Sequence, residues 1–430
     1  MLLDDFFHYI YKEKPLSLDK DMADSIECIT YINPKPQNNE KTESIRDFPS
    51  SFKNNPSPQL TFCVLTKNEE RCIQRCIHSI YNHANEILVI DTGSTDKTLE
   101  IISSNFKDIR IYNKEWTNDF SDIRNYALNL ATYTWVFFLD ADEYMPPESL
   151  NNLKNILRLT EMIEDQCYCL SPSILDLNGN RYTHTQRILN KNFDFHYIGR
   201  VHEELKSNHF DIIFDIGLSL TIFHDGYEQD VYLNKRKTER NMNLIKLMLN
   251  EEPDNLKWHY YHARALLKYQ QAPDEYEAEQ ELLRVSLTDN NFTSRSLILL
   301  GQLYCKRADI INLKKIITLI KESTTFFPQV DLMYLEMALY LMIVLTRMKT
   351  IRISAEELID GINNSLIHSR NEHLKNMMGL YSFHMAEFNK ITDFLTSNEN
   401  CINDNPVIYE EIASSLQLLD RMKHKILQIY

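Results

Sequence analysis

Three carboxylates end one of the most apolar runs in the chain. The stretch WVFFLDADEYMPPE, residues 135–148, leads from five apolar residues into Asp140, Asp142 and Glu143 and then reaches two prolines. On an extended chain, residues i and i+2 point to the same side, so the side chains of Asp140 and Asp142 can converge at the end of a strand. Two carboxylates held this close repel each other unless a cation lies between them.

A divalent ion is the cation that suits such a pair. Mg²⁺ and Mn²⁺ are typically held by one or two carboxylates together with the phosphates of a substrate. The alternative is a solvated acidic turn that caps a helix starting near Pro147. The surroundings favour the metal site, because further polar residues are expected at the same edge of the fold.

Two other predicted strands also end on polar residues. In LVIDTGSTDKT, Asp91 follows an apolar run and Gly93 bends the chain toward a helix. One glycine and two acids suit a ribose or a base edge better than a pyrophosphate. In LTKNEE, Asn68 and Glu69 follow the first strand. Three strand ends therefore bring polar groups to one edge of one sheet.

The elements that must position these groups alternate between strand and helix. Apolar runs predict strands over 60–65, 86–90, 109–113 and 135–139, and helical spacing predicts helices over 69–82, 94–106 and 119–132. Continuous apolar strands that alternate with helices indicate a parallel sheet covered on both faces. In such sheets, ligands bind outside the carboxyl ends of the strands, where the strand order switches.

The rest of the chain differs in character from this alternation. Residues 1–58 predict a helical segment and a proline-rich linker, and residues 160–224 predict strands joined by polar loops. After Tyr227 the pattern is almost entirely helical, with a break at Ala272-Pro273 between two helices. The helix pairs resemble tetratricopeptide repeats, although His262 stands where a small residue is usual.

Composition narrows the classes of function. The 46 basic and 61 acidic residues leave a net charge of −15, which argues against nucleic-acid binding and against a broad grip on anionic membranes. Neither a signal peptide nor a membrane span is predicted, so we expect a cytoplasmic protein. Eight scattered cysteines without paired CxxC sets favour buried, reduced thiols over a zinc site.

Several segments resemble family 2 glycosyltransferases: FCVLTKNEERCIQRCIHSI, EILVIDTGSTDKT and FFLDADEYM. WTNDFSDIRNYAL resembles a branch of that family that often carries tetratricopeptide-like repeats. Within that branch, GRVHEE, HDGY and RNMNLIKLMLNEEPDNLKW resemble the bacterial glycocin glycosyltransferases. Those enzymes attach a hexose to Cys, or sometimes Ser, of a ribosomally made bacteriocin precursor.

The resemblance implies a fold and three parts of the chain. It implies an α/β GT-A domain, the fold of nucleotide-diphospho-sugar transferases, followed by an all-α, tetratricopeptide-like helical-repeat domain. The expected boundaries are 1–58 for the N-terminal helical segment and linker, 59–227 for the catalytic domain and 228–430 for the helical domain.

The resemblance also assigns residues to the donor. Glu69, Asp91, Asp119, Arg124 and Asp140 would bind the UDP-sugar, with Asp91 contacting the uracil or ribose and Arg124 the diphosphate. Asp140 would touch either the ribose or the metal. For Asp119 and Arg124 the alternative is an ion pair within a helix, worth about a few tenths of a kcal/mol.

The metal and the second half of the site complete this picture. Mg²⁺ or Mn²⁺ would be held by Asp140 and Asp142 together with His224, whose alternative is an ordinary turn histidine. Arg187 and Arg200 either orient phosphates or pair with surface acids.

Inverting sugar transfer needs a base that takes the proton of the acceptor. In GRVHEEL, strand alternation sends Glu203 opposite to His202 and Glu204, and the resemblance favours Glu203 as the base, with Glu204 as the alternative. A thiol acceptor would ease this demand, because a Cys with a reference pKa near 8.5 is already partly ionised.

The function implied is a metal-dependent, inverting peptide glycosyltransferase that uses a UDP-hexose, with UDP-glucose favoured. Its partners would be a bacteriocin precursor peptide and, through the helical domain, a second copy of the chain. One alternative is a family 2 glycosyltransferase acting on a cell-wall or lipid-linked saccharide. Another is an inactive helical-repeat adaptor.

Overall fold

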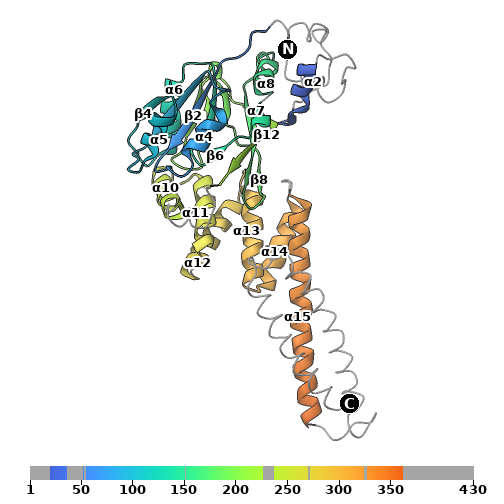
Figure 1. Cartoon of the computed structure of the whole chain (residues 1–430). Coiled ribbons are helices and arrows are strands. Elements are labelled where there is room, and N and C mark those ends of the chain that lie inside the picture. The colour runs from blue at the N-terminus through green and yellow to red at the C-terminus, as the bar shows by residue number, and fades with distance from the viewer. Residues whose placement is uncertain are drawn as a thin grey trace, which may run out of the picture. The chain divides into compact units, whose positions relative to one another are not determined.

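The computed structural model describes residues 20–35, 52, 55–150, 152–225, 237–269, 272–323 and 327–361. The chain divides into two compact units, residues 1–248 and 249–430. Many of their helices and some of their strands are labelled in Figure 1. This division falls later in the sequence than the expected start of the helical domain at residue 228, and the three-part division remains a prediction.

The first unit is built on one mixed sheet, to which the described residues contribute ten strands. Along its main path the strand order is β1-β12-β7-β9-β5-β2-β3-β4, with β6 paired to β12 and β8 to β7. The strands are β1 (Ile29–Asn33), β2 (Leu60–Thr66), β3 (Glu86–Asp91), β4 (Arg110–Asn113), β5 (Trp135–Asp140), β6 (Glu143–Tyr144), β7 (Tyr168–Asp176), β8 (Arg181–Tyr182), β9 (Ile188–Asn190) and β12 (Phe214–His224). A separate hairpin pairs β10 (Phe195–Ile198) with β11 (Glu204–Ser207).

The half of the sheet nearest the predicted site is parallel. Strand β2 pairs in parallel with β3 on one side and with β5 on the other, and β3 pairs in parallel with β4. These strands lie where the apolar runs predict them. The chain runs outward through β2, β3 and β4 and then returns to the other side of β2 as β5, so the strand order switches between β2 and β5.

The other half of the sheet is not parallel. Strand β9 runs antiparallel to both β5 and β7, and β12 runs parallel to β7. The edge strand β1, antiparallel to β12, comes from the region expected to hold only a helix and a linker. Its apolar side chains Ile29 and Ile32 are buried, so this edge contributes to the core.

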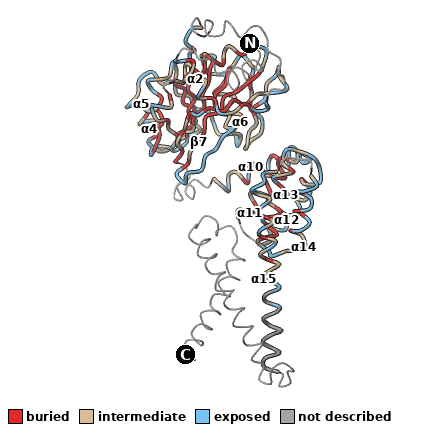
Figure 2. Tube along the Cα trace, turned by 90° about the vertical axis from the view of Figure 1, so that its right-hand side faces the viewer, coloured by how far each residue is buried: buried red, intermediate tan, exposed pale blue. Residues whose placement is uncertain are grey.

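Side chains alternate between two apolar layers, one on each face of the sheet. On β2, Phe62 and Val64 join the layer beneath α2, α4 and α8, whereas Cys63 joins the layer beneath α6 and the β10–β11 hairpin. Figure 2 shows the buried residues concentrated along the sheet. The helices of this unit are α2 (Lys20–Glu27), α4 (Ile73–Ile80), α5 (Thr98–Asn105), α6 (Phe120–Leu130), α7 (Pro147–Leu150) and α8 (Leu153–Thr160). The seven described cysteines are free, and all except Cys28 are buried.

The second unit is helical. Consecutive helices pack against each other from α11 through α15, as the predicted helix pairs require. Gly301 of α13 gives the close approach this packing needs, because a Cβ atom there would lie 2.7 Å from the side chain of Leu335. The helices are α11 (Leu256–Tyr269), α12 (Ala272–Ser286), α13 (Thr293–Lys306), α14 (Ile310–Glu322) and α15 (Gln329–Gly361); α10 (Lys237–Glu251) spans the division between the units. Across the described residues, no helix combines the length and apolar character that crossing a bilayer requires.

We expect Phe137→Ala to destabilise the first unit by about 3–5 kcal/mol, the usual cost of removing a buried aromatic ring. Phe137 is fully buried at the centre of β5, and its ring stacks on Phe62 with centroids 5.0 Å apart. Urea unfolding followed by circular dichroism measures the loss. The control is Leu177→Ala, at a side chain that is 59% exposed, which should change stability by less than about 0.5 kcal/mol. Equal effects of the two substitutions would contradict this account of the core.

Candidate functional site

The carboxyl ends of the four parallel strands meet at one edge of the sheet. Thr66 of β2 lies opposite Asp91 of β3, and Asp91 lies opposite Asn113 of β4. On the other side of β2, Leu65 lies opposite Asp140 of β5. The backbone register therefore brings the polar strand ends to the edge that the sequence predicts.

Asp140 and Glu143 share one arginine. Arg187, the residue before β9, places its Nη2 atom 3.0 Å from Asp140 Oδ2 and 3.0 Å from Glu143 Oε1. The turn is closed by the Asp140 backbone N–H, which donates to Glu143 Oε2 at 2.8 Å. Arg124 of α6 adds a second cation, with Nη2 3.6 Å from Asp140 Oδ1. Two guanidiniums thus surround the acidic end of β5.

The two carboxyl groups have opposite pKa shifts. Burial opposes ionisation of Asp140, but Arg187 and Arg124 outweigh burial and hold its pKa well below the ordinary value. Glu143 is only 1% exposed, and burial raises its pKa to about 8, although Arg187 opposes that rise. Asp140 therefore carries the negative charge of this pair at neutral pH.

Asp142 faces the end of β12 instead of facing Asp140. Its Oδ1 lies 3.5 Å from His224 Nε2, and its Oδ2 lies 3.3 Å from Lys237 Nζ at the start of α10. The pairing of β6 with β12 sets Glu143 opposite His224 and so brings the imidazole to this place. Burial lowers the pKa of His224, and the nearby carboxylates oppose that shift.

Two carboxylates and an imidazole are a suitable set of ligands for Mn²⁺. The facing Asp142 Oδ1 and His224 Nε2 atoms fit a shared cation. Asp140, however, is turned toward its arginines. Within the described part of the chain, the one group of three such ligand atoms that all lie within 4.8 Å of one another is on α11 and α12. The metal role of Asp140, Asp142 and His224 remains a prediction.

Glu203 and Glu204 lie in different surroundings. Arg124 Nε donates to Glu203 Oε1 at 2.7 Å, and the Glu203 side chain is 15% exposed. Glu204 begins β11, is 43% exposed, and lies 3.7 Å from Lys206 Nζ. Arg124 is therefore a direct link between Glu203 and Asp140. Residues 201–203 precede β11, and His202 has φ +50°, so the strand alternation expected through His202, Glu203 and Glu204 is wrong.

The Asp91 carboxylate organises the loop that follows β3. Its Oδ2 accepts hydrogen bonds from the backbone N–H groups of Gly93 and Ser94, each at 3.0 Å, and its Oδ1 accepts one from the Ser94 hydroxyl. The Ser94 hydroxyl in turn accepts the N–H of Asn68 at 2.9 Å. Gly93 has φ +100°, a conformation that glycine adopts without strain. These bonds fix the loop next to the strand ends.

Glu69 and Asp119, the other two predicted donor residues, make local contacts here. The Glu69 N–H donates to Thr98 Oγ1 at 2.8 Å, and its carboxylate accepts the Cys72 thiol at 3.0 Å. Asp119 caps α6 by accepting the N–H of Asp122 at 3.1 Å and the Ser121 hydroxyl at 2.6 Å. Their roles in binding a donor remain predictions.

Four site residues have no role assigned to them by sequence reasoning: Glu143, Asp225, Lys237 and Arg240. Arg71, two residues before α4, donates to Asp225 through Nη1 and Nη2 at 3.1 and 3.2 Å, and the Asp225 N–H donates to the Asp142 carbonyl at 3.2 Å. The basic cluster NKRKTER at residues 234–240 is the sequence signal for Lys237 and Arg240. Arg240 lies over the Phe120 ring at 4.8 Å.

The arrangement provides anion-binding donors beside acids. Burial lowers the pKa of Arg240, whereas the charges of Asp140, Glu203 and Asp142 raise it. The guanidinium of Arg240 therefore interacts electrostatically with the acids of this site. The Nη1 atoms of Arg124 and Arg187 are buried and make no hydrogen bond to the other described residues. Such a site can bind an anionic group through the guanidiniums of Arg124 and Arg187, and the neighbouring Glu203 carboxylate can accept a proton from a second reactant.

Comparison with known proteins gives a matching family model, described as "Glycosyl transferase family 2", over residues 61–226. The chain is 27% identical over 386 residues to the SPbeta prophage-derived glycosyltransferase SunS of Bacillus subtilis, covering 88% of this chain and 89% of that protein. It is 29% identical over 136 residues to an uncharacterized glycosyltransferase of Rickettsia bellii, covering 30% of this chain and 45% of that one. Among solved structures, S. aureus TarS 1-349 in complex with UDP-GlcNAc matches with a TM-score of 0.35 and 16% identity, covering 58% of this chain and 87% of that chain.

We expect Glu143→Gln to become more stable relative to the wild type as pH rises from 5 to 8. Because burial raises the pKa of Glu143 to about 8, the folded protein keeps a proton there that the unfolded chain has already released. Between the pKa of Glu143 in the unfolded chain, about 4.3, and its pKa in the folded protein, this difference in bound protons lowers the free energy of unfolding as pH rises. Gln cannot ionise, so the variant lacks this loss.

The expected relative gain is up to a few kcal/mol, since one unit of pKa corresponds to about 1.4 kcal/mol. Denaturant unfolding of both proteins at a series of pH values measures the difference. A difference that stays constant from pH 5 to pH 8 would show that Glu143 is ionised in the folded state.

Proposed function

Residues 61–226 form a family 2 glycosyltransferase domain, and from this premise we propose that the chain moves a hexose from a UDP-sugar to a Cys or Ser side chain of a peptide, with inversion at the sugar. The peptide we propose is a bacteriocin precursor, and UDP-glucose is the donor we favour. The similarity to the glycosyltransferase SunS over 88% of the chain supports sugar transfer, and the choice of peptide and donor comes from the resemblance of the sequence motifs.

The observation that carries the proposal is the set of cations around Asp140. Arg124 and Arg187 each pair with this carboxylate and each have a buried Nη1 without a hydrogen bond to another described residue. Guanidinium N–H groups suit phosphate oxygens in geometry and in charge. We therefore assign Arg124 and Arg187 to the diphosphate of the donor, and Asp91 and Glu69 to its nucleoside side.

A divalent ion belongs to the same proposal. Asp142 and His224, with Asp140, would hold Mg²⁺ or Mn²⁺, and the bound ion would supply positive charge to the leaving diphosphate. Lys237, which lies 3.3 Å from Asp142, adds a further positive charge at the same place. The Arg71 contact to Asp225 holds the backbone next to this group.

Glu203 is the base in this proposal. It takes the proton of the acceptor thiol or hydroxyl as the acceptor atom forms its bond to the anomeric carbon. The bond from that carbon to the phosphate oxygen breaks, and its electron pair leaves with UDP. Arg124 Nε, 2.7 Å from Glu203, fixes the carboxylate beside the arginines assigned to the diphosphate.

The helical unit is assigned to the precursor peptide and to pairing with a second copy of the chain. Paired helices offer extended surfaces for such contacts. Along α15, several large apolar side chains are more than half exposed: Val330, Met333, Met337 and Tyr340. A spacing of three or four residues places them along one side of the helix.

Intact-mass analysis of a candidate precursor peptide tests the proposal. The peptide is incubated with Mn²⁺ and, in separate reactions, with each of a panel of UDP-sugars. A gain of about 162 Da indicates one hexose, and a gain of about 203 Da indicates one N-acetylhexosamine. An unmodified peptide together with a modified lipid-linked saccharide would favour the alternative acceptor. Absence of both transfer and UDP-sugar hydrolysis would favour the inactive adaptor.

We expect Glu203→Gln to lower kcat by about a hundredfold or more, since a positioned base contributes about 10²–10⁴-fold. Glu204→Gln is the matched control, with the same change of charge at the neighbouring residue, and should stay within about threefold of wild type. With a Cys peptide, raising the pH should restore part of the Glu203→Gln activity, because the thiol then ionises by itself. A larger loss in Glu204→Gln, or no recovery at high pH, would contradict the assignment.

A further inference from the structure

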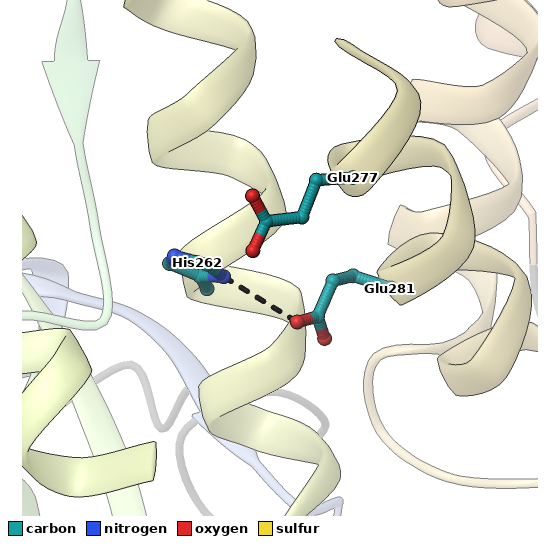
Figure 3. A group of neighbouring side chains, drawn as sticks. All are labelled: His262, Glu277 and Glu281. Atoms are coloured by element: carbon teal, nitrogen blue, oxygen red, sulfur yellow. Dashed lines mark hydrogen bonds and ion pairs between the residues drawn. The ribbon is translucent and has the colours of Figure 1, made fainter. Parts of the chain in front are cut away.

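A group of potential metal ligands lies in the helical unit, apart from the site described above. One ligand atom each of His262 on α11 and of Glu277 and Glu281 on α12 lies within 4.8 Å of the others. Figure 3 shows the two glutamate side chains reaching from α12 toward the imidazole on α11. Glu277 and Glu281 are four residues apart on one helix, so they share a face and can approach one cation together.

His262 occupies a position that a small residue normally fills in paired helices of this kind. Counting four residues from Trp258 reaches His262, and counting four from Leu297 on α13 reaches Gly301, which packs directly against Leu335. An imidazole at such a position must lie between the helices, and His262 is indeed only 4% exposed. Its Nδ1 lies 3.4 Å from Glu281 Oε1, while its Nε2 is buried without a hydrogen bond to another described residue.

A second histidine holds Glu281 from one side. His259 Nδ1 contacts Glu281 Oε2, and His259 Nε2 lies 2.8 Å from the carbonyl oxygen of Pro253. A histidine or carboxylate that binds a metal is usually held in this way by a partner on its other side. The contact leaves Glu281 Oε1 facing His262.

Glu277 is the residue that distinguishes a metal site from a simple ion-pair network. Its side chain is exposed, and no hydrogen bond or ion pair joins it to another of the described residues. An ion-pair network between Glu281 and the two histidines would be complete without it. A cation between the helices, by contrast, would use the carboxylate that Glu277 directs toward His262.

We propose that His262, Glu277 and Glu281 bind a divalent transition-metal ion of the zinc class and that this ion joins α11 to α12. Imidazole together with carboxylate ligands suits Zn²⁺ and related transition-metal ions. The site is independent of the nucleotide, because all of its ligands come from one helix pair. Binding of the ion stabilises the folded helical unit, since the unfolded chain does not hold the three ligands together.

Thermal unfolding with and without Zn²⁺ tests the proposal on the full chain freed of metal by chelation. No nucleotide is added, and the experiment is repeated in Asp142→Asn to remove any contribution from the first unit. We expect ZnCl₂ to raise the Tm of the wild type and of Asp142→Asn. In Glu277→Gln, the zinc affinity measured by calorimetry should fall by about tenfold or more, because replacing even a residue that only orients a metal ligand lowers metal affinity by about that factor.

The control is Asp289→Asn, which removes the same charge from an exposed acid of the same unit and should keep the full response to zinc. The metal-free Tm of Glu277→Gln should equal that of the wild type, because Glu277 is exposed. A zinc response of equal size in Glu277→Gln and Asp289→Asn would overturn the proposal, as would a wild type whose Tm does not respond to zinc.

Discussion

The contacts of Arg187 with Asp140 and Glu143 are the constraint on which the acidic end of β5 depends. β5 ends at Asp140 and β6 begins at Glu143, and burying such acids is costly unless a cation and hydrogen bonds accompany them. Arg187 meets both, and the Asp140 N–H donates to Glu143. The turn closed in this way pairs β6 with β12, which brings His224 to Asp142. A single guanidinium therefore contacts the acids on both sides of Asp142, one of the proposed metal ligands.

The same balance of charge gives the site its chemistry. Arg124 is shared between Asp140 and Glu203, so the residue proposed to hold the diphosphate also positions the proposed base. α10 adds Lys237, and Arg71, just before α4, holds Asp225. Every acid at the end of β5 thus has a basic neighbour from a different element. The basic side chains of such a site can pair with the phosphates of a bound nucleotide in place of a carboxylate, and no buried charge is then left without a partner.

The sequence predicts the part of the fold that depends on local pattern. Strands β2 to β5 and helices α4 to α6 follow from apolar periodicity, and the meeting of Asp91 and Asp140 at one edge follows from parallel strands. The pattern does not reveal β1, because a five-residue strand carries little periodic signal. It predicts strands between residues 160 and 224, but it does not reveal that β9 runs antiparallel to its neighbours. The pairing of Arg187 with Glu143 spans 44 residues, and nothing local in the sequence distinguishes it from a surface ion pair. The sequence also cannot decide the role of Asp119, because its position fits both a helix cap and the family motif, and in the structure it caps α6.

Binding of Mn²⁺ in the presence and absence of UDP is the most direct measurement of the central claim, that a divalent ion and a nucleotide diphosphate meet at the end of β5. Electron paramagnetic resonance of free Mn²⁺ gives the amount bound, and the difference made by UDP isolates this site from any metal held by the helices. The account predicts UDP-dependent Mn²⁺ binding in the wild type that weakens by about tenfold or more in Asp142→Asn, whose unfolding transition should stay cooperative. Mn²⁺ binding that does not depend on UDP, or that Asp142→Asn leaves unchanged, would contradict it.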